Sequence, residues 1–304
     1  MIRQLQYLVA LAREEHFARA AEACGVSQPT LSAALRQLEE DLGTAIVERG
    51  NRFRGFTPEG EIVLRWARRI LSDELSLKQD LDASRGILAG RLRLGVIPSA
   101  NAIAPRLTTS FAQANALVSI DETETTSDEI LRNLAIFELD AAITYIDNEP
   151  VERVRALPIA IERYALVLPE TSPLAKLGAV TWAQAATLPL CLLRPDMQNR
   201  RIFESAFARA NVTPTVRVEV NSMMAKLYYL ATGSWSTIMP ETLTHPFAGL
   251  AGMRILPLVE PEVTKTVGLV IADRDPIPAL IQAFWEHVER LDLRNAFSFP
   301  GESS

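Results

Sequence analysis

Short polar side chains and arginines gather in two neighbouring stretches near the start of the sequence. The first stretch is GVSQPTLSAALRQLEEDLG, in which a turn at Gly25 leads into a predicted helix. The side chains expected to face outward from this helix are those of Gln28, Pro29, Thr30, Ser32 and Arg36. Amide, hydroxyl and guanidinium groups bind base edges and phosphates in the major groove of DNA. The chemistry that this stretch suits is therefore recognition by hydrogen bonding, without bond making or breaking.

The spacing around this helix predicts a helix-turn-helix. Small Ala21 lets two helices cross closely, Gly25 can take the left-handed conformation of a tight turn, and Leu31 pins the second helix to the first. The other apolar positions of the pattern are Ala20, Cys24, Val26 and Ala34. Ser27 is the expected N-cap and is also predicted to be one of the DNA-binding residues, and Pro29 is tolerated in the first turn. A generic helix hairpin with a solvated polar face is the alternative, and the agreement of cap, turn and packing positions favours the helix-turn-helix.

The second stretch is ERGNRFRGFTPEG, residues 48 to 60, which holds Arg49, Arg52 and Arg54 without an intervening acid. Its glycines and asparagine predict a hairpin-like turn, or wing, whose arginines suit phosphates or a narrow minor groove. Residues 1 to 60 hold seven arginines and eight acids, so only the face with Arg36 and the wing can be positive. A monomer with so few phosphate contacts is expected to bind weakly, and a dimer doubles them.

A long helix is predicted directly after the wing. Thr57 and Pro58 suit its N-cap and first position, and the pattern continues to about Ser84, a length of about 40 Å at 1.5 Å per residue. Its apolar stripe consists of Val63, Ala67, Ile70, Leu77 and Leu81, interrupted by Glu74. Pairing with the same helix of a second chain is favoured over packing within the chain. SRGILAG, residues 84 to 90, then indicates a hinge.

From Arg91 onward, short apolar segments alternate with helical patterns. Strands are predicted at residues 91–97, 117–122, 140–145, 164–169, 188–193, 215–220 and 266–272, with helices at 201–210 and 222–231 among them. The alternation predicts an α/β fold with mostly parallel sheets in two small lobes. Ligands of such sheets bind at the carboxyl ends of the strands, in the cleft. Before Arg91, TAIVER at residues 44–49 is the one possible strand.

Composition and charge exclude several classes of protein. The 304 residues are 48% hydrophobic and 22% charged, with a net charge of −6, which is a globular composition large enough for two or three domains. No apolar run suits a signal peptide or a membrane helix, so a cytoplasmic location is expected. Cys24 and Cys191 are far apart, and the three histidines are scattered. Neither a disulfide, a metal site nor a cofactor is expected.

Two other classes remain as alternatives. An enzyme is disfavoured because the sequence holds no GxSxG, GxxxxGK or GxGxxG motif. A small-molecule-binding protein without DNA function is disfavoured because it would need neither the capped helix nor the arginine wing.

These residues resemble the LysR-type transcriptional regulators. The resemblance is carried by LQYLVALAREEHFARAAEACGVSQPTLSAALRQLEEDLG, by VERGNRFRGFTPEG, and more loosely by RLRLGVIPS, ELDAAITY and ATGSWSTIMPE. It implies an N-terminal winged helix-turn-helix and a long linker helix. It also implies a two-lobe effector domain similar in fold to periplasmic solute-binding proteins. Such a regulator is a homo-oligomer, often a dimer of dimers, that binds promoter DNA and responds to a small molecule in the cleft.

The resemblance also implies boundaries and DNA contacts. The reading domain would be residues 1–57, the dimerisation helix 58–87 and the effector domain 88–304. Lobe 1 would comprise about 91–161 and 267–293, and lobe 2 about 162–266. Gln28, Pro29, Ser32 and Arg36 match the contact positions of the recognition helix, and Arg52 or Arg54 match the wing. Ala33 departs from the family, because relatives often have a larger polar residue there.

By the same resemblance, the effector would lie in a ring of loop ends. The ring residues are Pro98, Ser99, Ala100, Asn101, Thr125, Thr126, Ser127, Tyr145, Met197, Gln198, Asn199, Arg200, Asn221, Ser222 and Met223. Their hydroxyl and amide groups, together with helix N-termini, would favour a small anion or carboxylate. The alternative is that Ser127 and Ser222 merely cap helices.

The N-terminal segment is similar to the peroxide-sensing branch of the family. That branch needs a reactive cysteine near the start of the helix that begins here around Gln198, where this chain has Gln198 and Asn199. Cys191 lies in an apolar strand that disfavours a thiolate, so thiol-based peroxide sensing is not expected. FELDAAITYIDNEP and LCLLRPDMQNRR resemble members associated with formate metabolism. The effector, the operator, and the choice between activator and repressor stay open.

Overall fold

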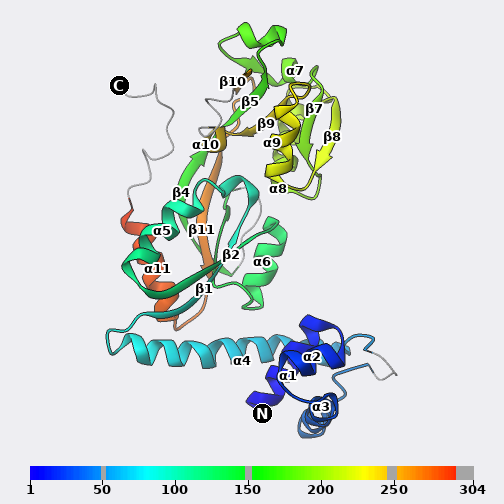
Figure 1. The fold of residues 1–304 in the computed structure, drawn as a ribbon, viewed down its shortest axis with the longest axis vertical. Coiled ribbons are helices and arrows are strands. Elements are labelled where there is room, and N and C mark those ends of the chain that lie inside the picture. The colour runs from blue at the N-terminus through cyan, green and yellow to red at the C-terminus, as the bar shows by residue number, and fades with distance from the viewer. Residues whose placement is uncertain (49–52, 148–152, 245–251, 292–304) are drawn as a thin grey trace. The chain divides into compact units, whose positions relative to one another are not determined.

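Four helices form the N-terminal part of the chain in the structure, which is a computed structural model (Figure 1). The structure describes residues 1–48, 53–147, 153–244 and 252–291. The helices are α1 Ile2–Glu14, α2 Phe17–Ala23, α3 Gln28–Leu42 and α4 Pro58–Ala83. By its contacts the chain divides into two units, residues 1–88 with 135–138 and 278–280, and the remainder.

The helices begin at the residues that the caps predict. The Ser27 hydroxyl accepts a hydrogen bond from the Thr30 N–H at 3.3 Å, and the Thr57 hydroxyl accepts one from the Gly60 N–H at 2.9 Å. Gly25 has a φ of +65°, as the predicted turn between α2 and α3 requires. These local signals suffice to place α3 and α4 because a helix start depends on its own neighbouring residues.

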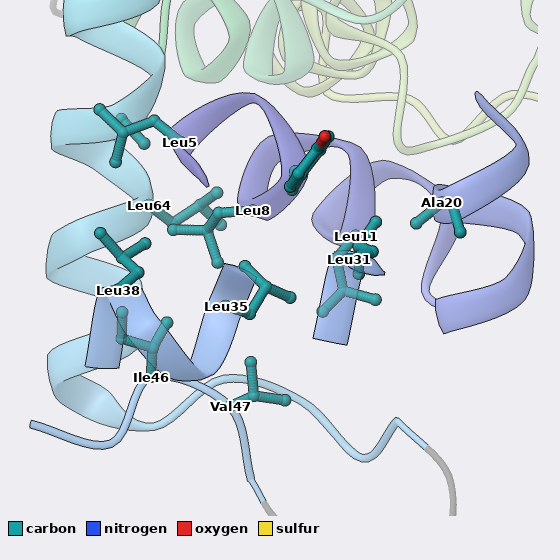
Figure 2. Close-up of a cluster of buried hydrophobic side chains, with 13 residues drawn as sticks. Leu5, Leu8, Leu11, Ala20, Leu31, Leu35, Leu38, Ile46, Val47 and Leu64 are labelled. Carbon is teal, nitrogen blue, oxygen red and sulfur yellow. The ribbon is translucent and has the colours of Figure 1, made fainter. Parts of the chain in front are cut away.

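The core of the first unit lies between α1, α2, α3 and the start of α4 (Figure 2). Its buried side chains include Leu8, Leu11, Leu31, Leu38 and Leu64. Val63, Ala67 and Ile70 of the predicted α4 stripe pack in this core as well. The first half of the stripe therefore packs within the chain, while Leu77 and Leu81 are 61% and 51% exposed.

The described residues between α3 and α4 have little strand character. Val47 and Phe56 form an isolated antiparallel bridge, and the Glu48 N–H donates to the Gly55 carbonyl at 3.1 Å. The possible strand at residues 44–49 is thus reduced to one bridge within the described residues.

The first lobe of the second unit is a five-stranded sheet of order β2-β1-β3-β11-β4. Its strands are β1 Ala89–Val96, β2 Leu117–Glu124, β3 Ala141–Tyr145, β4 Val154–Glu162 and β11 Lys265–Ala272. Its helices are the short η1 Pro98–Ala100, α5 Ala104–Ala114, α6 Ser127–Ala135 and α11 Ala279–Arg290. Phe111 of α5 packs edge-on against Phe284 of α11 at 5.1 Å, so these helices cover the sheet together (Figure 1).

The second lobe holds a four-stranded sheet of order β6-β10-β5-β9 and a two-stranded sheet of β7 and β8. Its strands are β5 Tyr164–Pro169, β6 Val180–Thr181, β7 Leu190–Leu193, β8 Val216–Val220, β9 Thr237–Pro240 and β10 Met253–Val259. Its helices are η2 Pro173–Lys176, α7 Trp182–Ala185, α8 Gln198–Arg209, α9 Met223–Ala231 and α10 Glu241–Thr244. A bridge between Leu190 and Ser236 connects β7 to the segment before β9.

The prediction of mostly parallel sheets was wrong. β11 runs antiparallel to β3 and β4, and β5 runs antiparallel to β9 and β10, whereas β1–β2, β1–β3, β7–β8 and β6–β10 are parallel. In the first lobe, the antiparallel β4–β11 pair lies where the chain leaves and re-enters the lobe. β4, β6, β9 and β10 were missed, and prolines at positions 158, 240 and 257 obscure three of them.

Candidate functional site

The outer face of α3 is polar along its length. Gln28, Ser32 and Arg36 are four residues apart and therefore lie on one face of the helix. Gln28 and Arg36 are exposed, and Ser32 is half-buried. Leu31 and Leu35 on the inner face are buried in the core. The core thus fixes which side of α3 is presented to a partner.

The first turn of α3 combines capping with exposure. Gln28, Pro29 and Thr30 are all exposed. The hydroxyls of Ser27 and Thr30 lie 2.8 Å apart and hydrogen-bond to each other. Since the Ser27 hydroxyl also caps the helix, its role within the chain is to hold the first turn in place.

The base of the wing is tied to α3 by a residue that the sequence did not single out. A carboxylate oxygen of Glu39 accepts hydrogen bonds from the N–H groups of Ile46 and Val47, at 2.8 and 3.1 Å. Phe53 packs edge-on against Phe17 and Phe56, with ring centroids 6.2 and 5.1 Å apart. The sequence did not single out Glu39 and Phe53, because their roles depend on the residues that they contact and not on their residue types.

Of the three predicted wing arginines, Arg54 lies within the described residues. Arg54 is exposed, directly after Phe53. Arg49 and Arg52 lie outside the described residues.

In the second unit, several ring residues meet around the hydroxyl of Tyr145. Tyr145 donates to a carboxylate oxygen of Glu162 at 2.5 Å and accepts hydrogen bonds from Tyr164 at 3.4 Å and from the Asn199 amide at 3.3 Å. Ser99 lies close enough to the same hydroxyl to lower the pKa of Tyr145. We call Ser99, Tyr145, Glu162, Tyr164 and Asn199 the tyrosine cluster. All five side chains are buried, and they come from η1, β3, β4, β5 and α8.

A second polar contact joins the starts of α6 and α8. The Ser127 hydroxyl donates to the Gln198 amide oxygen and accepts a hydrogen bond from Thr144 at 3.2 Å. Asp128 and Arg201 form an ion pair at 3.7 Å between the same two helices. The structure therefore brings Ser127, Gln198 and Asn199 together from distant parts of the sequence, as the ring requires.

Three buried polar atoms of the tyrosine cluster have no hydrogen-bond partner among the described residues. They are Ser99 Oγ, Glu162 Oε2 and Asn199 Oδ1. Ser99 Oγ influences the pKa of Tyr145 but makes no hydrogen bond of ordinary geometry with it. Leaving a buried polar atom unpaired costs about 1–3 kcal/mol. Three such atoms in one cluster indicate a place where a small polar molecule can bind.

Burial favours the neutral form of the Glu162 carboxyl group. Burial raises the pKa of Glu162 to about 8, even though the nearby hydroxyls of Tyr145 and Tyr164 favour the ionised form. The negative charge of Asp147 raises this pKa as well. Burial also raises the pKa values of Tyr145 and Tyr164, so both phenols stay protonated.

Other predicted ring residues have partners of their own. The Asn101 amide donates to Glu124 at 2.5 Å, and the Thr125 hydroxyl donates to Glu129. The Thr126 hydroxyl accepts from the Glu129 N–H at 3.2 Å, so Thr126 caps α6 and Ser127 does not. Ser222 does cap α9, accepting from the Ala225 N–H at 3.5 Å.

The remaining ring residues contribute shape or structure. Met223 belongs to a buried apolar cluster against which Met197 packs. The Arg200 guanidinium donates to the Leu193 carbonyl at 2.8 Å and pairs with Glu219 at 2.9 Å and Glu204 at 3.0 Å. Pro98 and Ala100 are buried in the turn of η1, and Asn221 is exposed.

The sequence analysis did not predict two buried residues with ionisable side chains. Glu162 ends a strand that was not predicted, and Lys226 lies within α9. The Lys226 ammonium donates to the Ile238 carbonyl at 2.6 Å, and burial lowers its pKa to about 7. No sequence signal separates a buried Glu or Lys from the exposed majority.

The cysteines carry no sign of activation. Burial raises the pKa of the Cys191 thiol, an effect that Lys226 partly opposes, and burial raises the pKa of Cys24 too. Within the described residues no cluster of potential metal ligands occurs and no helix is long and apolar enough to cross a membrane.

Comparison with known proteins gives concordant results for the two units. Residues 2–61 match the family described as bacterial regulatory helix-turn-helix protein, lysR family, and residues 85–292 match the LysR substrate binding domain. The DNA-binding transcriptional dual regulator OxyR of Escherichia coli K12 is 29% identical over 293 residues, covering 96% of each chain. The regulator BbuR of Bordetella bronchiseptica is 31% identical over 222 residues, covering 73% of this chain and 68% of that protein.

Solved structures share the fold. A full-length OxyR variant of Pseudomonas aeruginosa superposes with a TM-score of 0.73 at 24% identity, covering 96% of this chain and 99% of that one. CbnR in complex with its target DNA gives a TM-score of 0.66 at 23% identity, covering 95% and 99%. The predicted fold class is therefore confirmed.

Proposed function

The chain belongs to the LysR family of bacterial regulatory helix-turn-helix proteins, and on this premise we propose that α3 and the wing read promoter DNA while the tyrosine cluster receives the effector. As a member it is a DNA-binding transcriptional regulator with an effector-binding domain, and its relatives are regulators rather than enzymes. The proposal adds the residues that perform each task and the chemical class of the effector.

The DNA-reading proposal rests on the face of α3 that the core leaves exposed. Gln28 and Arg36 extend from this face with Ser32 between them, and amide and guanidinium groups can each form paired hydrogen bonds with a base. Pro29 and Thr30 complete the contact surface at the helix tip. Ser27 acts indirectly by fixing the first turn. Arg54, with Arg49 and Arg52, would bind the phosphates beside the groove.

The effector proposal rests on the three unpaired buried atoms of the tyrosine cluster. The effector would be a small anion or carboxylate, supported by the hydroxyl of Ser99 and by the neutral state of Glu162. Ser127 and Gln198 would transmit its binding, because they connect the starts of α6 and α8, and Asn199 beside Gln198 donates to Tyr145. A change in these contacts would shift the regulator between two forms.

The proposal also assigns a role to each part of the chain. Residues 1–57 would read DNA, 58–87 would form the dimerisation helix and 88–304 the effector domain, with lobe 1 at about 91–161 and 267–293. The exposed Trp66, Leu77 and Leu81 of α4 support a homodimer or homotetramer. Acting on promoter DNA, the protein would work in the cytoplasm.

A selection of bound fragments from random DNA tests the reading residues. We expect the full-length chain to enrich one sequence motif, and Gln28→Ala to lose the base preference at one position with about a 5- to 150-fold drop in specific affinity. Gln37→Ala is the matched control, because Gln37 lies on the same helix but hydrogen-bonds Asp41 at 3.0 Å. An unchanged motif from the Gln28 variant would remove Gln28 from the reading surface.

A further inference from the structure

Glu162 occupies a junction that the family assignment does not explain. It is the last residue of β4 and is fully buried, next to Tyr145 at the end of β3 and Tyr164 at the start of β5. Its Oε1 accepts the hydrogen bond from Tyr145, and its Oε2 has no partner among the described residues. One oxygen of a buried carboxyl is therefore satisfied and the other is not.

Among the described residues, the neighbours of Glu162 include no cation that pairs with its carboxyl group. Lys265 pairs with Glu162 across the β4–β11 ladder, but its side chain is half exposed and forms no ion pair with Glu162 in the described structure. Arg200 on α8 is paired with Glu219 and Glu204. Asp147 after β3 adds a negative charge, and the other neighbours are Tyr145, Tyr164, Asn199 and Ser99. The carboxyl group therefore keeps its proton at neutral pH.

The position of this proton follows from the hydrogen bonds. Because Oε1 accepts from Tyr145, the proton belongs on Oε2, which makes Oε2 a donor without an acceptor. The Ser99 hydroxyl is a second buried donor nearby. A carboxylate brings acceptors to these two donors, whereas an ammonium group, which brings only donors, would suit Asn199 Oδ1, the one unpaired acceptor of the cluster.

We propose that the tyrosine cluster binds a small carboxylate together with one proton, which Glu162 carries on Oε2 and donates in a hydrogen bond to the ligand. This inference rests on the proposed role of the cluster as the effector site. No covalent bond changes, and the proton is taken from solvent whenever Glu162 is ionised before binding. Glu162 thereby selects the charge of the effector and makes its affinity depend on pH.

The pH dependence has a defined sign. Below the pKa of Glu162, about 8, the site is already protonated and carboxylate affinity is constant. Above it, each pH unit lowers the affinity about tenfold, because the proton must first be taken up. A cationic ligand would show the opposite trend.

The test uses the full-length chain and acetate as the probe, titrated calorimetrically between pH 6 and pH 9.5. We expect the acetate Kd to be constant to about pH 8 and then to rise. Glu162→Gln should bind acetate with a constant Kd, because its amide N–H replaces the donor but cannot ionise. Glu170→Gln is the control, since Glu170 is exposed just after β5, the next strand along the chain, and it should behave like the unmodified chain.

A second measurement does not depend on any variant. The heat of acetate binding at pH 9, compared between buffers with different ionisation enthalpies, should show uptake of close to one proton per acetate, about 0.9 for a pKa of about 8.

Four outcomes would overturn the proposal. Acetate affinity that rises with pH, equal pH dependence in the unmodified and Glu162→Gln chains, or no acetate binding at pH 6 would each do so. Tighter binding of methylammonium above pH 8 would assign the site to a cation instead. Promoter binding by the same protein samples separates this result from a failure of the regulator function.

Discussion

At the scale of single residues, two serines have different surroundings: Ser27 is the N-cap of α3, and Ser32 lies within the helix. The Ser27 hydroxyl caps the helix by accepting the Thr30 N–H, while Ser32 lies on the outer face with Gln28 and Arg36. The same chemical group therefore serves stability at one position and contact at the other. Exchanging each for alanine separates these two functions.

We expect Ser27→Ala to destabilise the first unit by about 1 kcal/mol, the usual value of an N-cap hydrogen bond. Ser32→Ala should leave the melting temperature unchanged and weaken binding to the preferred DNA sequence. Thermal melting and fluorescence anisotropy of the full-length chain measure the two effects. Equal melting temperatures for both variants would show that the cap is not needed to hold α3.

At the scale of elements, the start of α4 is fixed by a close approach to the base of the wing. A Cβ at Gly60 would lie 2.0 Å from the Ile46 carbonyl oxygen and 2.9 Å from its carbon. Thr57 on the same turn donates to the Ala45 carbonyl at 2.6 Å. Gly60 is thus required for α4 to leave the base of the wing in this direction.

This contact reverses the usual effect of a glycine substitution. Gly→Ala within a helix ordinarily stabilises it by about 1 kcal/mol, but at Gly60 the backbone of Ile46 would have to move. We expect Gly60→Ala to lower the melting temperature. It should also weaken DNA binding, because the backbone at Ile46, at the base of the wing, would be displaced. Gly178→Ala is a control for the substitution itself, because a Cβ at this position, outside any helix, meets nothing within 4 Å. A raised melting temperature for the Gly60 variant would contradict the close approach.

The elements that the sequence predicted are those with local causes. The caps at Ser27 and Thr57 and the turn at Gly25 depend on a few adjacent residues, and all three appear in the structure. The strand β4 was missed because Pro158 interrupts its pattern. The state of Glu162 could not be read from the sequence, because it depends on Tyr145 and other residues that only the fold brings near.

In the effector ring as well, the contacts of each side chain depend on residues distant in the sequence. Sequence resemblance placed Tyr145 and Asn199 in it, and the structure joins their side chains. It also placed Asn101 and Arg200 there, and both are held by neighbouring acids. Position in a chain can predict which loops converge, but the partner of each side chain is decided by neighbours distant in sequence.

At the scale of the whole molecule, the second half of α4 presents apolar side chains that its own unit does not cover. Leu77 and Leu81 are one turn apart and more than half exposed, and Trp66 on the first half is 56% exposed. Exposed apolar residues in a row on one helix favour pairing with the same helix of a second chain. A dimer would also place two copies of Arg36 and of Arg54 on one DNA site.

We therefore expect Leu77→Glu combined with Leu81→Glu to dissociate the oligomer, because four like charges would face each other across the helix pair. Sedimentation equilibrium of the full-length chain measures this effect. Lys78→Ala is the control, since Lys78 is exposed and pairs only with Glu74 of its own helix, at 2.8 Å, among the described contacts. Surface pairs of this kind contribute little, so the control should keep the oligomer.

The Leu77→Glu, Leu81→Glu variant also allows the number of phosphates that each chain contacts to be measured. The slope of log affinity against log salt counts the phosphates that the protein contacts. If each chain of a dimer supplies its own wing, the slope of the double variant should be about half that of the unmodified protein. A monomer that retained the full slope would show that one chain makes every phosphate contact, and α4 would then serve only to position the effector domain.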